Sequence, residues 1–399
     1  MIRPRLAWVG ALLLLAACAT ALAPISPPTP ASFSEEDRTH GHMLAVLGNC
    51  VECHTIPGGK PLAGGRAVET PFGTIYSSNL TPDAETGIGG WPLDAFRRAL
   101  RQGLGRDGRR LYPAFPYDHF TKLEDADIDT LYAYLMSGTP AAFVAPEPKL
   151  RFPYNIRSLV AVWQALYVTM GPLTPDPAHD AAWNRGRYLA EAVAHCAACH
   201  TPRDSLGGEI KSRPYAGGES DGWAAPPLGA NARGPWTADA LALYLSRGWD
   251  ETHGLAAGPM MPVAVAMAQA DPKDVQALAS YLADFSAKVP APQPTSASPR
   301  KPIVHPEGAA LYESQCVSCH RLRGDEVDFA GFTLLRLDSP VNLLHWLLEG
   351  LNGPAGTTMP GFAKSLNDHQ IAALAAFLRE DVARYPAWPK LEEQSKSLR

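Results

Sequence analysis

The sequence has no long run of lysine or arginine, and its formal net charge is only −5 over 399 residues. Such a charge distribution argues against a nucleic-acid partner. Beyond the first residues there is no apolar stretch long enough to cross a bilayer as a helix. Stretches that alternate apolar and polar residues are scarce, so we expect few strands. The length itself favours two or three domains.

The sequence also lacks the residue arrangements that are typical of common enzyme active sites. No serine or cysteine stands in a nucleophile motif, and no pair of carboxylates is spaced to face one way from a helix. Residues 103–108 match the dinucleotide pattern GxGxxG, but they follow an expected helix at 93–102 and no βαβ unit surrounds them. We therefore interpret this segment as a loop.

The N-terminus predicts export. Arg3 and Arg5 precede an apolar run that ends before Cys18, which resembles a lipoprotein signal whose cleavage makes Cys18 the acylated N-terminus. The alternative is ordinary cleavage after Ala21-Leu22-Ala23, with Pro24 in an awkward position for it. We expect residues 1–23 to be the signal region and the mature chain to be soluble or lipid-tethered.

Six of the seven cysteines belong to one motif that occurs three times, at residues 50–54, 196–200 and 316–320. Each copy reads Cys-x-x-Cys-His. Cysteines three residues apart lie on one face of a helical turn and can form thioethers with both vinyl groups of a haem, and the next histidine then ligates the iron. The motifs predict three covalently bound haem c groups, attached through Cys50, Cys53, Cys196, Cys199, Cys316 and Cys319, with His54, His200 and His320 as proximal ligands.

Other roles for the cysteine pairs account for fewer features of the motif than haem attachment does. Disulfides do not require a histidine after each pair. A structural zinc site needs four ligands, and each motif offers at most three. A thioredoxin-like pair belongs in a βαβ setting, which is absent.

The sequence around each motif repeats as well. A short amphipathic helix is expected before each motif, at 41–49, 186–195 and 308–315, and a second helix with an acidic or amide lead-in closes each unit. Proline-rich breaks separate the units. We predict an all-α fold of three tandem cytochrome c domains at 35–170, 178–289 and 303–385, a linker at 290–302, and a polar surface tail at 386–399.

A methionine in the loop before each closing helix is the natural sixth ligand of the iron. Met359 is the only methionine of the third unit. In the second unit Met260 is preferred over the adjacent Met261, with His253 and Met267 as weaker alternatives.

In the first unit Phe115 occupies the corresponding place, and His119 follows four residues later. Three hypotheses stay open. His119 ligates the iron, or the iron is five-coordinate beneath Phe115, or Met136 or Met43 reaches it.

A further signal lies in residues 70–91, 111–117, 200–203 and 258–260. Through these stretches, nearly the whole mature chain resembles the triheme cytochrome subunits of membrane-associated bacterial dehydrogenases. The resemblance implies a periplasmic subunit, associated with the membrane surface, that takes electrons from a dehydrogenase catalytic subunit and passes them to ubiquinone or a terminal oxidase.

Phe115 departs from the alcohol and sugar dehydrogenase pattern, which has methionine there. The version with Phe115 and His119 is similar to subunits paired with molybdenum hydroxylases, for example those acting on nicotinate, isoquinoline or aldehydes. The resemblance thus implies, as the first candidate partner, a catalytic subunit that contains molybdenum and iron–sulfur clusters. A quinoprotein or flavoprotein catalytic subunit is the second candidate. On this interpretation the chain transfers electrons and is not catalytic alone. A rival of another class is a peroxidase-like haem enzyme that uses an open first haem.

Overall fold

The computed structural model describes residues 20–228, 236–286, 302–321, 331–352 and 358–399. Within these residues no helix is both long and apolar enough to span a membrane. Cys18 and nearly all of the expected 290–302 linker fall outside the described residues.

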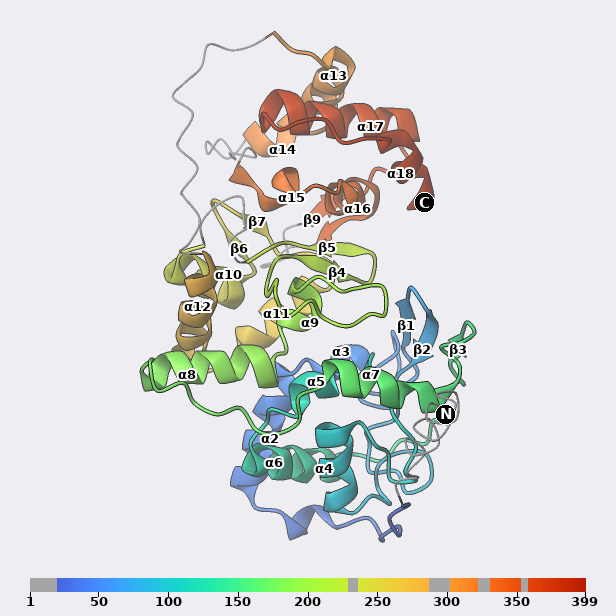
Figure 1. Cartoon of the computed structure of the whole chain (residues 1–399). Coiled ribbons are helices and arrows are strands. Elements are labelled where there is room, and N and C mark those ends of the chain that lie inside the picture. Colours follow the sequence, from blue (N-terminus) through green and yellow to red (C-terminus); the bar gives the residue numbers. More distant parts are fainter. Residues whose placement is uncertain (1–19, 229–235, 287–301, 322–330, 353–357) are drawn as a thin grey trace, which may run out of the picture. The chain divides into compact units, whose positions relative to one another are not determined.

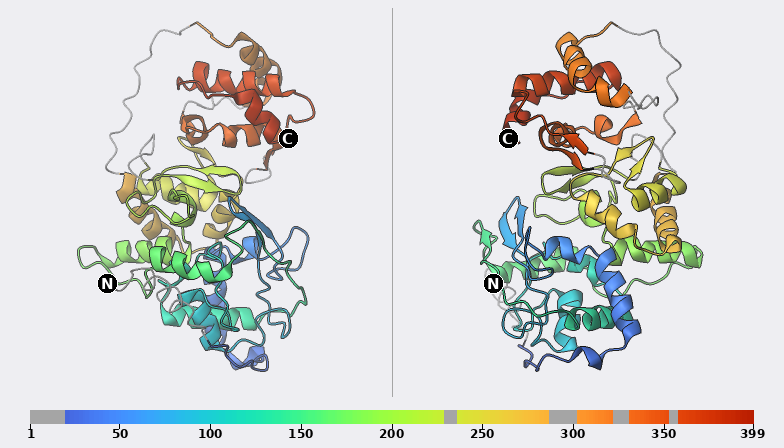
Figure 2. Two further views of the ribbon diagram at one scale, coloured as in Figure 1. Left: turned by 45° about the vertical axis from the view of Figure 1, so that its right-hand side comes forward. Right: turned by 180° about the vertical axis from the view of Figure 1, so that it is seen from behind.

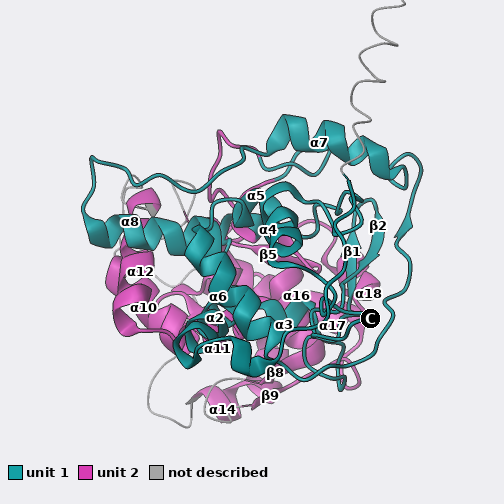
Figure 3. Ribbon diagram, turned by 90° about the horizontal axis from the view of Figure 1, so that it is seen from below, with its two compact units in different colours: residues 1–198, 203–209 teal, residues 199–202, 210–399 magenta. Residues whose placement is uncertain are grey.

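The chain divides into two compact structural units, unit 1 and unit 2, coloured separately in Figure 3. These differ from the three sequence units described above, each built around one Cys-x-x-Cys-His motif, which are called the first, second and third repeats from here on. Unit 1 comprises residues 1–198 and 203–209, and unit 2 comprises residues 199–202 and 210–399. The start of the expected second domain, up to Ala198, therefore belongs to the same unit as the expected first domain.

Unit 1 is built mainly from helices joined by long irregular segments (Figure 1). Its elements are η1 (Pro30–Ser32), α2 (Glu35–Leu47), α3 (Cys50–Cys53), β1 (Ala67–Thr70), β2 (Gly73–Tyr76), α4 (Leu93–Gln102), α5 (Tyr117–Phe120), α6 (Asp125–Met136), β3 (Lys149–Leu150), η2 (Arg157–Leu159), α7 (Val160–Tyr167), α8 (Ala181–Tyr188) and the π-helical turn η3 (Leu189–Val193). The boundary between the units falls within α9 (Ala197–His200).

Unit 2 repeats the same kinds of element. They are β4 (Gly218–Ser220), β5 (Trp223–Ala225), α10 (Ala238–Arg247), β6 (Trp249–Asp250), β7 (Gly254–Leu255), α11 (Met260–Met267), α12 (Pro272–Ser286), α13 (Pro306–Gln315), α14 (Val317–Arg321), α15 (Thr333–Arg336), α16 (Val341–Glu349), β8 (Gly350–Asn352), β9 (Thr358–Pro360), α17 (Asp368–Ala376), the π-helical turn η6 (Phe377–Val382) and α18 (Leu391–Ser397).

Small antiparallel sheets accompany the helices, so the expectation of a purely α-helical chain needs correction. The described residues form one three-stranded sheet, β1-β2-β3, and two-stranded hairpins β4-β5, β6-β7 and β8-β9. Each strand has two to four residues. Strands this short show too little alternation of apolar and polar side chains to be detected in a sequence.

Around the first and third haem motifs, the helix before the motif packs against the helix that closes the repeat. In unit 1 α2 contacts α6, and in unit 2 α13 contacts α17; Figure 2 gives two further views of these helices. Gly41 of α2 and Gly308 of α13 stand at these crossings. A Cβ at Gly41 would overlap the Thr130 carbonyl oxygen, and one at Gly308 would overlap that of Ala373. The missing side chain lets the two helix backbones approach each other closely.

Local capping explains where these helices begin. The Ser34 hydroxyl accepts a hydrogen bond from the Asp37 amide, 3.0 Å away, at the start of α2. At the start of α17, Asn367 and Gln370 form a reciprocal capping box. Acidic residues lie in the first turn of α6, α12 and α17, where they complement the helix dipole. The three expected closing helices are confirmed.

The C-terminal segment is more ordered than the expected surface tail. Trp388 is buried, and its indole nitrogen donates a hydrogen bond to the Leu337 carbonyl oxygen at 2.9 Å. Ser395 in α18 is also fully buried, and its hydroxyl donates to Asp368 at the start of α17. These contacts join the end of the chain to the core of its own unit.

Candidate functional site

The first Cys-x-x-Cys-His motif follows directly from α2. Asn49 adopts a left-handed backbone conformation with φ of 51°, which turns the chain into α3, where Cys50 and Cys53 lie on one helical turn. His54 ends this helix, and its Nδ1 donates a hydrogen bond to the Ser78 carbonyl oxygen at 2.6 Å. This bond fixes the ring and leaves Nε2 with its lone pair, as a metal-ligating histidine requires.

The second motif is supported in the same way. His200 Nδ1 donates to the Pro226 carbonyl oxygen at 2.7 Å. In both motifs the acceptor follows a β-hairpin, β1-β2 before Ser78 and β4-β5 before Pro226. Burial lowers the pKa of His54 and of His200, so both rings are neutral near pH 7. A neutral imidazole is the form that binds iron.

A glycine amide also repeats beside the first two proximal histidines. The Gly64 amide donates to the His54 carbonyl oxygen at 2.7 Å, and the Gly217 amide donates to the His200 carbonyl oxygen at 2.8 Å. The hairpins that hold the histidine rings are therefore attached to the motifs at both the backbone and the side chain.

In the third motif Cys316 caps the end of α13, and Cys319 and His320 lie in α14. Burial lowers the pKa of His320 as well. The segment that would correspond to the supporting hairpin includes residues 322–330, which are outside the described residues.

Two of the motif cysteines, Cys50 and Cys316, have thiols that burial keeps protonated. Burial, with a smaller contribution from the neighbouring Cys53, raises the pKa of Cys50 to about 12. Burial likewise raises the pKa of Cys316 to about 11. Cysteines that react as thiolates have a lowered pKa, and these two thiols do not. Cysteine pairs followed by a histidine fit covalent haem c, and at His54 and His200 the Nδ1 contacts leave Nε2 for the iron.

Two methionines expected as sixth ligands stand in corresponding parts of the fold. Met260 is the first residue of α11, just after the β6-β7 hairpin, and is partly buried. Met359 lies in β9, paired with Leu351 of β8, and packs against the core of the third repeat. Met359 belongs to a hairpin and Met260 follows one, and each hairpin begins directly after a helix. The two methionines therefore occupy corresponding places in the fold as well as in the sequence.

The alternatives in the second repeat differ in what they contact. Met267 is buried in α11, and Met261 Sδ lies toward Gly248, at the start of the hairpin. His253 stacks on Trp236 with ring centroids 3.5 Å apart, and its Nδ1 lies 2.7 Å from Asp250 Oδ1. Its buried Nε2 has no hydrogen-bond partner among the described residues.

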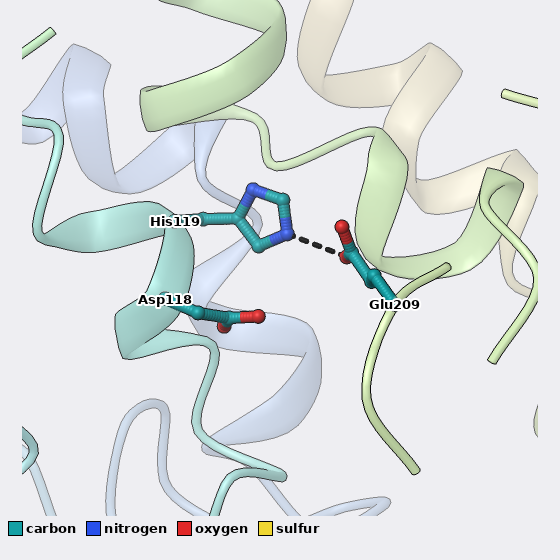
Figure 4. Close-up of side chains that lie close together, drawn as sticks. All are labelled: Asp118, His119 and Glu209. Atoms are coloured by element: carbon teal, nitrogen blue, oxygen red, sulfur yellow. Dashed lines mark hydrogen bonds and ion pairs between the residues drawn. The ribbon is translucent and has the colours of Figure 1, made fainter. Parts of the chain in front are cut away.

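His119 in the first repeat is 2 % exposed, and protein oxygen atoms face both of its ring nitrogens. Figure 4 shows the contact of its Nε2 with Glu209. Nδ1 lies 2.9 Å from the Glu191 carbonyl oxygen, and Nε2 lies 2.7 Å from Glu209 Oε1. A carbonyl oxygen only accepts hydrogen bonds, so Nδ1 carries a proton. With Glu209 ionised, Nε2 carries one too, and the ring is an imidazolium.

The surrounding charges support this ion pair. Burial acts to lower the pKa of His119, but the hydrogen bond with Glu209 and the charges of Asp118 and Glu209 outweigh it, so the pKa lies above its usual 6.5. Burial acts to raise the pKa of Glu209, but the hydrogen bond and charge of His119, then Arg203, bring it below its usual 4.5. Ligating atoms of Asp118, His119 and Glu209 lie within 4.8 Å of one another, but the shared proton satisfies His119 and Glu209 without a metal ion.

In this arrangement His119 presents no lone pair to an iron. Ligation of the first haem by His119 stays a prediction. It requires the Nε2 atom of His119 to give up its hydrogen bond with Glu209. Of the other candidates, Met136 is buried in α6 and Met43 is partly buried in α2, whereas Phe115 packs against Phe120 with ring centroids 5.5 Å apart.

The partners of His119 could not be found from the sequence. Glu191 and Glu209 lie 72 and 90 residues away along the chain. His195, which precedes the second motif, packs near the same ring, with centroids 6.4 Å apart. No spacing rule connects positions so distant. The local signal was Asp118, an acidic neighbour whose charge favours a protonated ring.

Comparisons with known proteins identify the family of the chain. The family model "Cytochrome c" matches residues 39–139 and 184–286, and the model "Cytochrome C oxidase, cbb3-type, subunit III" matches residues 305–378.

Three relatives are similar over most of this chain. A subunit of nicotinate dehydrogenase from Pseudomonas putida is 44 % identical over 95 % of this chain, although the chain spans only 33 % of that protein's length. The fructose dehydrogenase cytochrome subunit of Gluconobacter japonicus is 35 % identical over 94 % of this chain and 85 % of its own length. The gluconate 2-dehydrogenase cytochrome c subunit of Pantoea cypripedii is 34 % identical, with 85 % and 84 % covered.

Proposed function

We propose a route for electrons through this chain, from a dehydrogenase partner to ubiquinone or a terminal oxidase. The chain belongs to the family of cytochrome c subunits of bacterial dehydrogenases. Electron transfer from a dehydrogenase is accordingly its function, and the chain is an electron-transfer subunit and not a catalytic one. We propose that it carries three haem c groups in three tandem domains at 35–170, 178–289 and 303–385. In support, each family-model match lies inside one of these spans.

Each haem, when bound, accepts and releases one electron at its iron. The chain's own residues set the conditions for this step. Burial keeps the His54 and His200 rings neutral, and the Ser78 and Pro226 carbonyl groups orient them. Met260 and Met359 are the proposed sixth ligands of the second and third haems, where a thioether sulfur raises the reduction potential. For the first haem His119 stays the sequence-based candidate.

The count of haems is the quantity to test first. A pyridine haemochrome assay together with the mass of the mature chain should give three haems per polypeptide. A matched variant, Cys319→Ser, removes one thioether of the third site and should lower only that site's attachment. A value of two haems in the unaltered chain would reject the proposal.

The proposed partner is a molybdenum hydroxylase. The supporting observation is that the nicotinate dehydrogenase relative is 44 % identical to this chain, whereas the fructose and gluconate dehydrogenase subunits are 35 % and 34 % identical. The names of these relatives do not give the electron acceptor, and we propose ubiquinone or a terminal oxidase. A quinoprotein or flavoprotein dehydrogenase is the second candidate.

Co-purification from native membranes distinguishes these partners. A tagged copy of the chain should retain a large subunit that contains molybdenum by metal analysis. Recovery of a subunit with bound quinone or flavin cofactor would favour the second candidate. Fast binding of carbon monoxide at one haem, with peroxide turnover by the purified chain alone, would instead favour the haem-enzyme rival.

We further propose a periplasmic location with a lipid anchor on Cys18, which rests on the sequence alone. Growth with labelled palmitate should label the unaltered chain and leave the Cys18→Ser variant unlabelled and released from membranes. Equal membrane retention without label in both would contradict the anchor.

A further inference from the structure

The segments that lead into the first two haem motifs contact each other inside unit 1. His195 Nε2 lies 3.3 Å from the Gly48 carbonyl oxygen, although the two residues are 147 positions apart. Gly48 stands two residues before Cys50, and His195 stands directly before Cys196. The hydrogen bond thus connects two cysteines that are proposed to hold different haems.

The proton in this contact is on His195. A carbonyl oxygen only accepts, so Nε2 must carry the hydrogen. Burial and then the charge of His119 lower the pKa of His195 to about 4, so the ring is neutral near pH 7. A neutral ring with hydrogen on Nε2 is the tautomer that the Gly48 carbonyl oxygen requires.

The backbone at His195 is unusual for a residue with a side chain. Its φ is +39°, in the left-handed region. The equivalent position of the first motif is Asn49, with φ of 51°, and asparagine tolerates this region better than most residues. In the third motif the equivalent position is Gln315. Histidine, like asparagine, adopts this region more often than most residues with a side chain, so His195 fits the turn before its motif.

The surroundings of His195 fix its ring. Phe120 packs edge-on against it, with ring centroids 5.3 Å apart at 84°. A Cβ at Gly48 would lie 3.3 Å from the Val193 carbonyl oxygen and 3.7 Å from Cys50 Sγ. The absence of a side chain at Gly48 lets the two lead-in segments approach this closely.

We propose that His195 is a positioning residue that couples the first and second haems electronically, through the path Cys50, Gly48 carbonyl, His195 ring and Cys196. The inference rests on the proposed function. In the step, one electron leaves a reduced iron and reaches an oxidised one, with no bond broken and no net proton movement. Bonds and a hydrogen bond transmit electronic coupling better than a gap of the same length.

Two substitutions at His195 test this path in the full holo-protein. His195→Gln places an amide N–H close to the position of Nε2 and is the residue of the third motif. His195→Asn is the residue of the first motif and suits the left-handed backbone, but its amide is too short to reach Gly48. His195→Gln keeps the hydrogen bond, and His195→Asn keeps a residue that tolerates the left-handed backbone. Comparing the two variants separates the effect of the hydrogen bond from the effect of the backbone conformation.

The measurement is the redistribution of one photochemically injected electron, followed by freeze-quench EPR, which distinguishes individual ferric haems. Equilibrium potentials and the thermal unfolding midpoint are recorded for the same samples. We expect a severalfold slower exchange between the first two haems in His195→Asn, a rate near that of the unaltered chain in His195→Gln, and unchanged potentials in both.

An unaltered exchange rate in His195→Asn would overturn the proposal. Equal slowing in both variants, with shifted potentials or a lower unfolding midpoint, would also overturn it, because His195 would then be purely structural. Fewer than three haems in the unaltered chain would contradict the proposed function instead, and the haemochrome value shows this before any rate is read.

Discussion

The His119–Glu209 contact predicts a pH-dependent stability that a single substitution removes. The His119 side chain is 3 % exposed and that of Glu209 is 16 % exposed, so solvent screens the pair weakly. Breaking a buried ion pair by removing one partner costs about 3–5 kcal/mol when a charge is stranded. In Glu209→Gln the ring can release its proton and accept a hydrogen bond from the new amide. The cost should therefore be that of a charged hydrogen bond, about 1.5–3 kcal/mol.

The sign of the pH dependence follows from the two pKa shifts. The pKa of His119 is raised, so its contribution is complete below 6.5 and is lost as pH rises through the raised value. The pKa of Glu209 is lowered, so its contribution is complete above 4.5 and is lost as pH falls through the lowered value. The difference between the unaltered chain and Glu209→Gln should thus be largest between about pH 4.5 and 6.5 and should shrink at higher pH.

Urea titrations of the holo-protein at several pH values measure this difference. Glu219→Gln, which changes an exposed carboxylate on β4, is the matched control and should leave stability nearly unchanged at every pH. A stability loss in Glu209→Gln that is constant from about pH 5.5 to about pH 9 would refute the ion pair. So would a new high-spin ferric EPR signal in His119→Ala, because it would show that the ring binds an iron in the holo-protein.

Three further outcomes are expected. Gly41→Val should reduce the free energy of unfolding by about 1–3 kcal/mol or more, since its side chain meets the Thr130 carbonyl oxygen at the α2–α6 crossing; thermal unfolding measures this, and an unchanged midpoint would contradict the close approach. Met359→His should lower the potential of one haem in a redox titration, because a nitrogen ligand replaces the thioether sulfur; an unaltered titration would exclude Met359 as a ligand. Asn342→Ala removes two hydrogen bonds to the Ala224 backbone, at 2.8 and 2.9 Å, and should cost about 1–3 kcal/mol in urea titrations, whereas no loss would mean that water replaces both.

The sequence alone predicts the haem attachment chemistry, because that chemistry is local. Two cysteines three residues apart and a following histidine fit about one helical turn, and the short helices α3 and α9 lie at the first two motifs. Helix caps are equally local, so the starts of α6, α12 and α17 could be predicted from acidic or amide lead-ins. The short hairpins that orient His54 and His200 were missed, since strands of three or four residues give no readable period.

Only the tertiary structure decided which groups meet across the chain. The partners of His119 come from 72 and 90 residues away, and His195 reaches Gly48 across 147 residues. Such contacts depend on how helices pack and where glycines permit close approach, and no spacing in the sequence encodes them. The sequence predicts His119 as an iron ligand, and only the fold shows that Glu209 and the Glu191 carbonyl group lie against its ring.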